Sequence, residues 1–220
     1  MAKIVEDYIN EYLRLHLASK NELLEEMEQY AKINHVPIIE KEVARFLEVL
    51  IKIKKPKRIL EIGTAIGYSS LIMKFAYPEA KITTIDINEK MYYTAQKNFK
   101  KAKVSDIHAI CADALESLEY LEGPYDFIFL DAAKGHYKEC FDYALNLLSK
   151  DGVILSDNIL FRGMVAKDKY VQHRKITIVR RMREFIKYIT NLESVSTSLI
   201  PIDDGMALTI KEEEYKDGKN

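Results

Sequence analysis

Short apolar runs alternate with helix-like stretches between Lys57 and Asp157, and this alternation restricts the fold more than any other feature of the chain. Each run has the length and apolar character of a buried strand. Strands that alternate with helices build a parallel sheet with helices on both faces. The candidate strands are RILEIG, KITTIDI, DIHAIC, YDFIFLD and GVILSD, and the helices between them are expected near residues 68–76, 89–102, 114–121 and 137–149.

The first part of the chain, residues 1–55, is helical in character. Apolar side chains recur there at three- and four-residue steps, which predicts three amphipathic helices. Asn21 is expected to cap the second helix, which would end near Asn34. The third helix would open at Pro37 and end before Pro56.

The last part of the chain predicts a helix and a hairpin. The helix should run from about Lys175 to Ile189, and two strands, ESVSTSLIPI and MALTIK, follow it. Asp203, Asp204 and Gly205 join these strands. A connection this short predicts an antiparallel pair at the edge of the sheet.

Composition and length point to one soluble domain. The 220 residues carry 33 Lys and Arg against 34 Asp and Glu, and 48% of them are apolar. No apolar run reaches the roughly 18 to 20 residues of a membrane span, no signal peptide is evident, and the two cysteines lie in unrelated contexts. We therefore expect a cytoplasmic protein without membrane contact, divided into a helical cap (1–55), an α/β core (56–212) and a tail (213–220).

The chain has only 8 glycines, and two of them stand four residues apart after the first strand. Gly63 and Gly67 would let the backbone turn tightly and approach a ligand, although their spacing is not that of the dinucleotide motif G-x-G-x-x-G. A tight strand-to-helix turn without a ligand is the alternative.

Two acids follow the next strands. Asp86 ends the second strand 23 residues after Gly63, where an acid commonly binds a ribose diol. The alternative is a cap for the helix that follows, a role that Asn88 could also fill. Asp113, after the third strand, could bind an adenine amino group or cap the next helix.

Oxygen-bearing side chains also end the fourth and fifth strands. Asp131 follows the fourth strand, and Asp157 and Asn158 follow the fifth. Two carboxylates and an amide suit a hard divalent cation such as Mg²⁺. Lys134 would face the same cleft, where a lowered pKa could make it a base. The alternatives are two caps that never meet and a surface lysine.

These segments together resemble the metal-dependent S-adenosylmethionine O-methyltransferases, the family of the catechol and caffeoyl-coenzyme A enzymes. The resemblance is carried, over roughly residues 36–210, by LEIGTAIGYSSL, Asp86, ADAL at 112–115, FLDAAKGHY and SDNILFRGMV. It implies a Rossmann-like class I fold with a mostly parallel seven-stranded sheet. LEEMEQYAKINHVPII at 24–39 is most similar to the small bacterial branch that methylates 5-hydroxyuridine in tRNA.

The resemblance also implies roles for single residues. Ile39, Glu61, Gly63 and Ser69 match positions around the methionine end of the cofactor, Asp86 matches the ribose-binding acid, and Asp113 and Ala114 match the pair beside adenine. Asp86 replaces the Glu that some relatives carry. Asp131, Asp157 and Asn158 match the metal ligands, and Lys134 matches the proposed general base. Asp131 is also counted with the cofactor contacts and, together with Lys134, as catalytic.

The substrate of such an enzyme needs two vicinal oxygens, one to react and one to chelate the cation. A catechol or hydroxycinnamoyl substrate has them, and so does 5-hydroxyuridine, giving 5-methoxyuridine in tRNA. The stretch from Ile159 to Asn191 favours tRNA, because it holds nine basic residues against two acids and would border the site. The basic residues are Arg162, Lys167, Lys169, Arg174, Lys175, Arg180, Arg181, Arg183 and Lys187.

Other interpretations remain open. The basic stretch could be a solvated helix face, and a tRNA substrate would have to present a base splayed out of the stack, as in an anticodon loop. A small phenolic substrate is the main alternative. A non-catalytic RNA- or nucleotide-binding module is a third, although it would not need the metal ligands. The family resemblance further suggests a homodimer.

Overall fold

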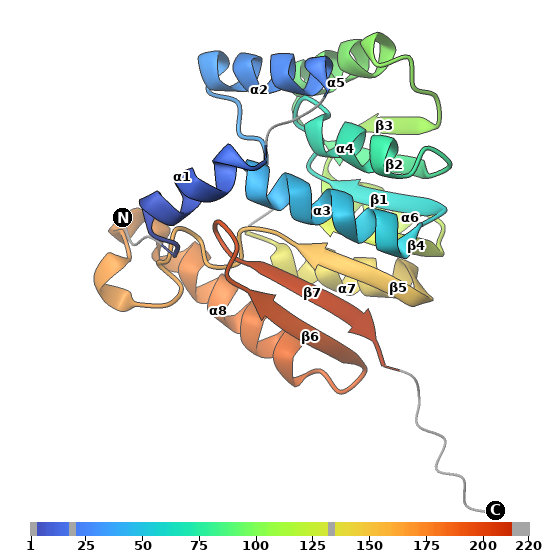
Figure 1. Cartoon of the computed structure of the whole chain (residues 1–220). Helices are drawn as coiled ribbons and strands as arrows, with labels where there is room; N and C mark the ends of the chain where they lie inside the picture. Colours follow the sequence, from blue (N-terminus) through green and yellow to red (C-terminus); the bar gives the residue numbers. More distant parts are fainter. Residues whose placement is uncertain (1–3, 18–20, 132–134, 213–220) are drawn as a thin grey trace, which may run out of the picture.

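The chain forms an open seven-stranded sheet in the order β3-β2-β1-β4-β5-β7-β6 (Figure 1). The computed structural model describes residues 4–17, 21–131 and 135–212. Strands β1 to β5 are parallel, and β7 runs antiparallel to both β5 and β6. The predicted mostly parallel sheet with a C-terminal hairpin is therefore confirmed. The strands are β1 (Arg58–Ile62), β2 (Lys81–Asp86), β3 (Ile107–Cys111), β4 (Tyr125–Leu130), β5 (Leu148–Ser156), β6 (Val195–Ile200) and β7 (Met206–Lys211).

Helices cover both faces of this sheet, each over its own apolar core. Side chains of α2, α3, α4 and α5 pack in one core with Ile59, Phe127 and Leu155 of the strands. Side chains of α6, α7 and α8 pack in the other with Leu60 and Ile128. The helices are α1 (Asp7–Leu15), α2 (Glu22–Asn34), α3 (Lys41–Lys54), α4 (Tyr68–Ala76), α5 (Glu89–Lys101), α6 (Ala114–Tyr120), α7 (Tyr137–Leu147) and α8 (Ile176–Asn191).

The N-terminal helices follow the sequence pattern with one correction. Asn21 caps α2 as predicted, because its side chain accepts hydrogen bonds from the backbone N–H groups of Leu23 and Leu24. The third helix begins at Lys41 and not at Pro37. The residues between them belong to no helix or strand, Glu40 before the helix is extended, and Ile39 is buried in the core.

A second correction concerns the boundary between α7 and β5. The helix expected over 137–149 ends at Leu147, and β5 begins directly at Leu148, four residues before the expected strand. Leu148 pairs with Tyr125 on β4 and is buried. Pairing and burial together therefore extend the strand toward its N-terminal end.

Within the described residues, no helix combines the length and the apolar character that crossing a bilayer requires.

Candidate functional site

The candidate site lies at the carboxyl ends of the central strands. Strand β1 pairs with β2 on one side and β4 on the other, and β4 pairs with β5. Open α/β sheets bind ligands at this edge. The loop after β1 and the acids that end β2, β4 and β5 therefore meet at one edge of the sheet.

The loop between β1 and α4 needs glycine at both of its predicted positions. Gly63 and Gly67 have positive φ angles of 110° and 82°, which other residues rarely adopt. A Cβ on Gly67 would also lie 2.5 Å from Cε1 of Phe99 on α5. Gly67 therefore allows the loop to pack closely on α5, and both glycines allow its backbone conformation.

Asp86 ties this loop to the end of β2. Its Oδ2 accepts a hydrogen bond from the Ala65 N–H at 2.7 Å, and its Oδ1 accepts one from the Asn88 N–H at 2.8 Å. The side chain of Asn88 caps α5 by accepting from the Met91 N–H. The helix cap thus falls to Asn88, and the Asp86 carboxylate faces the glycine loop.

Glu61 lies fully buried beneath the same loop. Its carboxylate accepts hydrogen bonds from the hydroxyls of Ser69, Ser70 and Thr84, the last at 2.6 Å. Burial raises its pKa to about 6, against the opposing effect of the three hydroxyls. Glu61 therefore holds the start of α4 in place from below the surface of the site.

Ser70 and Thr84 are partners that the sequence pattern did not single out. Thr84 stands beside Glu61 in the register of β1 and β2, and it also shares a hydrogen bond with Thr64 at 2.6 Å. A polar residue inside a buried strand is the signal that could have indicated Thr84, once the register was known.

Asp113 caps α6. Its Oδ1 accepts from the N–H groups of Leu115 at 2.8 Å and Glu116 at 3.3 Å, and Ala114 is the first residue of the helix. The capping interpretation of Asp113 therefore holds, and the adenine contact of Asp113 and Ala114 stays a prediction.

Asp131 and Asp157 follow directly neighbouring strand ends. Leu130 pairs with Ser156, and the Asp157 N–H donates to the Leu130 carbonyl at 2.9 Å, so the next residue on each strand falls at the same level. Asp157 is 1% exposed, and its Oδ1 accepts from the Asn158 N–H at 2.6 Å.

Asn158 adopts a left-handed φ of 58° at the point where the chain leaves the sheet. Asn tolerates this conformation better than most residues. Lys134, the predicted base, lies outside the described residues.

Tyr137 joins the two strand ends, and nothing in the sequence indicated this. Its hydroxyl oxygen lies 2.7 Å from the Leu130 carbonyl oxygen and 2.6 Å from that of Asp157. Burial raises the pKa of Tyr137 well above its usual value, and the carboxylates of Asp131 and Asp157 raise it further. The hydroxyl therefore contacts the backbone of both strand ends that carry the acids.

The donor set fits a hard cation. Among the described residues, no three side chains drawn from His, Cys, Asp and Glu come together as a metal site. A site here would depend on two carboxylates and the Asn158 amide oxygen, which are ligands that Mg²⁺ accepts while keeping positions for water or substrate.

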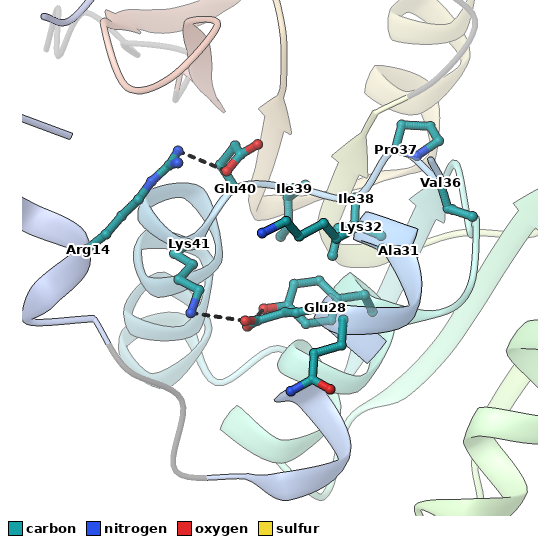
Figure 2. Close-up of a pocket in the computed structure, with 12 residues that line it drawn as sticks. Arg14, Glu28, Ala31, Lys32, Val36, Pro37, Ile38, Ile39, Glu40 and Lys41 are labelled. Atoms are coloured by element: carbon teal, nitrogen blue, oxygen red, sulfur yellow. Dashed lines mark hydrogen bonds and ion pairs between the residues drawn. The ribbon is translucent and has the colours of Figure 1, made fainter. Parts of the chain in front are cut away.

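A pocket of about 600 Å³ opens beside the site, between α2, the segment 36–41 and the start of α4 (Figure 2). Ile39 and Tyr68 line it. Its wall carries charges of both signs: Lys41 pairs with Glu28 at 3.0 Å, and Arg14 of α1 pairs with Glu40 at 2.8 Å (Figure 2). The Tyr68 hydroxyl also donates to Glu28 at 2.6 Å.

The sheet order, with a glycine loop and acids at the ends of the central strands, is that of a Rossmann-like fold. The chain belongs to the O-methyltransferase family, whose sequence profile matches residues 15–212. The protein is therefore an enzyme of this family.

Relatives carry names of the same kind. A caffeoyl-CoA O-methyltransferase of Populus kitakamiensis is 35% identical over 182 residues, which are 79% of this chain and 76% of the relative. A catechol O-methyltransferase of Niastella koreensis is 32% identical over 174 residues, 76% of this chain and 78% of the relative. A Bacillus cereus O-methyltransferase in complex with SAH superposes with a TM-score of 0.81 at 27% identity, covering 93% of this chain and 97% of that one.

Proposed function

We propose that the protein transfers a methyl group from S-adenosylmethionine to one of two vicinal oxygens of a substrate, with a divalent cation such as Mg²⁺ at Asp131, Asp157 and Asn158. The observation that carries this proposal is the placement of Asp131 and Asp157 at the same level on adjacent strand ends, one strand from the glycine loop.

The cofactor would lie across the ends of β1 and β2. A carboxylate has about four lone-pair sites, so Asp86 can accept from two ribose hydroxyls while it holds its two backbone N–H groups. Gly63 and Ser69 would contact its methionine end, and the pocket that Ile39 lines carries both signs of charge, as a zwitterion requires. The relative from Bacillus cereus, whose structure holds SAH, supports the choice of cofactor.

Each residue of the site would have a separate role in the reaction. A bound cation lowers the pKa of a hydroxyl that contacts it. Asp131, Asp157 and Asn158 would hold that cation, and Nζ of Lys134 would take the proton of the reacting hydroxyl. The substrate oxygen would bond to the methyl carbon as the carbon–sulfur bond breaks, with S-adenosylhomocysteine as the leaving group. Two-point attachment of the substrate would fix the line of attack.

A small phenol with two adjacent oxygens is the substrate we propose first. The relatives named for catechol and caffeoyl-CoA support this class. Such a ligand needs a pocket of modest size beside the cation, and vicinal hydroxyls supply both the nucleophile and the chelating group.

The 5-hydroxyuridine of tRNA is the second candidate, and the charge of α8 and the segment before it favours it. The Arg183 guanidinium has partners within the chain, since it pairs with Asp168 and donates to the carbonyls of Met164 and Val165. Arg174, Lys175 and Lys187 are exposed and could meet a phosphate backbone near an anticodon loop.

We also propose that two chains associate through the outer face of α1. Arg14 of α1 donates to Glu42 of α3 at 2.8 Å, and Leu13 lines an apolar pocket with Phe46 of α3, so one face of α1 is turned toward its own chain. Tyr8, Tyr12 and Leu15 of the same helix are 62–78% exposed, an apolar face that a second copy would cover.

One assay separates the two substrates. The protein is given labelled S-adenosylmethionine and Mg²⁺ with either a catechol panel or hydroxyuridine-containing tRNA. We expect transfer to catechols that is unchanged in a variant with Arg174, Lys175 and Lys187 all replaced by Glu. Transfer to tRNA alone, lost in this variant and steeply weakened by salt, would instead establish the second candidate.

A further inference from the structure

We propose that Tyr137 is a positioning residue that sets the separation of the Asp131 and Asp157 carboxylates and so tunes the affinity for the cation. This inference rests on the proposed function, because it concerns the same cation site. One buried hydroxyl would then determine the distance between two ligands that come from different strands.

The paired register of β4 and β5 ends at Leu130 and Ser156, and the Asp157 N–H adds one backbone hydrogen bond, to the Leu130 carbonyl, beyond that pair. The Asp131 N–H turns away from β5 and donates to the Ile62 carbonyl on β1 at 2.9 Å. On the other strand, Asn158 leaves the sheet in a left-handed conformation. The two ligand residues therefore stand where the ladder between β4 and β5 ends.

The Tyr137 hydroxyl spans this point. It lies 2.7 Å from the carbonyl oxygen of Leu130, the residue before Asp131, and 2.6 Å from the carbonyl oxygen of Asp157 itself. Leu130 O also accepts the Asp157 N–H at 2.9 Å. One hydroxyl proton is thus presented to two carbonyl groups that belong to the two ligand-bearing strand ends.

The ring holds the hydroxyl in place. Tyr137 is the first residue of α7 and is 3% exposed, and its ring packs on Phe185 of α8 with centroids 4.9 Å apart. Tyr137 follows Asp131 by six residues, and its contact with Leu130 connects the start of α7 to the end of β4. Groups behind metal ligands commonly change metal affinity by about 10- to 100-fold.

A purely structural role for the ring makes a different prediction, and Tyr137→Phe separates the two. The variant keeps the ring and its packing on Phe185 and removes only the hydroxyl. Tyr143→Phe is the matched control, because it removes a hydroxyl from the same helix, where that group bonds Glu119 at 3.0 Å.

The test is a titration of the full-length protein with Mn²⁺, followed by electron paramagnetic resonance, with S-adenosylhomocysteine affinity and circular dichroism measured on the same samples. We expect Tyr137→Phe to bind Mn²⁺ about 10-fold more weakly, with unchanged S-adenosylhomocysteine affinity and native circular dichroism. Tyr143→Phe should match the wild type. In turnover, the apparent KM for Mg²⁺ should rise in Tyr137→Phe while the KM for S-adenosylmethionine stays constant.

Equal Mn²⁺ affinity in Tyr137→Phe and the wild type would overturn the inference and leave the proposed function intact. An equal loss in Tyr143→Phe would overturn it too, because the effect would not belong to this hydroxyl. A wild-type protein that binds no Mn²⁺, while Asp157→Ala behaves identically, would refute the cation site and this inference with it.

Discussion

Glu61 shows how a single buried charge supports the cofactor loop. Its carboxylate is fully buried, and three hydroxyls donate to it. Desolvation outweighs these hydrogen bonds, so the pKa rises from 4.5 to about 6. The folded chain therefore binds this proton more tightly than the unfolded chain does.

The raised pKa of Glu61 should change how the free energy of unfolding depends on pH. The contribution of a group with a raised pKa is fully present below pH 4.5 and is lost as the pH rises through about 6. The shift corresponds to about 2 kcal/mol. Urea unfolding of the wild type and Glu61→Gln at pH 4.5 and pH 7 should show the wild type losing about that much relative to the variant. If the free energies of unfolding of the wild type and Glu61→Gln changed equally with pH, the pKa of Glu61 would not be raised.

A second prediction for a single residue concerns Gly67. Gly67→Ala would place a Cβ 2.5 Å from Phe99 at a φ of 82°, so strain and overlap act together. We expect a loss of about 2 to 4 kcal/mol in the free energy of unfolding, measured by urea denaturation. Gly135→Ala is the control, since the neighbour that its Cβ would meet among the described residues is Nη1 of Arg181 at 3.5 Å, an ordinary contact distance. Equal losses in both variants would show that the close approach to Phe99 does not matter.

The elements show how far the sequence alone could lead. The five parallel strands, the hairpin and most of the helices follow from local periodicity and strand length, which are properties of a short window. The start of α3 and the start of β5 do not, because the burial of Ile39 and the pairing of Leu148 with Tyr125 decide them. Such tertiary contacts have no local signal.

The residues of the site also include some that the sequence predicts and some that it does not. The glycine loop and the acids Asp86, Asp131 and Asp157 could be predicted, because each ends a recognisable strand. Thr84 and Tyr137 could not, since the role of Thr84 depends on the register of β1 and β2, and that of Tyr137 on the return of α7 to β4 and β5.

The cap of α2 is the prediction that belongs to a single element. Asn21→Ala removes the side-chain acceptor for the N–H groups of Leu23 and Leu24 and should cost about 1 kcal/mol of unfolding free energy. Asn21→Asp keeps an acceptor and should stay close to the wild type in the same denaturation experiment. If Ala and Asp destabilise equally, the cap is not what stabilises this end of the helix.

At the scale of the whole molecule, the exposed face of α1 predicts association. Size-exclusion chromatography with light scattering should give twice the chain mass for the wild type. Tyr12→Glu should shift it toward the monomer, because a charge would enter the proposed contact. Tyr120→Glu, at an 83% exposed position on α6, is the control and should remain dimeric. A monomeric wild type would rule out the proposed dimer.

The fold brings one loop and three strand ends together at one edge of the sheet. We propose that the cation binds at two of these strand ends, those of β4 and β5. The most direct test follows methyl transfer from labelled S-adenosylmethionine to a catechol, with Mg²⁺ or with chelator, for the wild type and Asp157→Ala. We predict transfer only by the wild type with Mg²⁺, a fall of at least about 100-fold on chelation or substitution, and retained cofactor binding by Asp157→Ala. Full transfer in the presence of chelator, or by Asp157→Ala, would contradict the account.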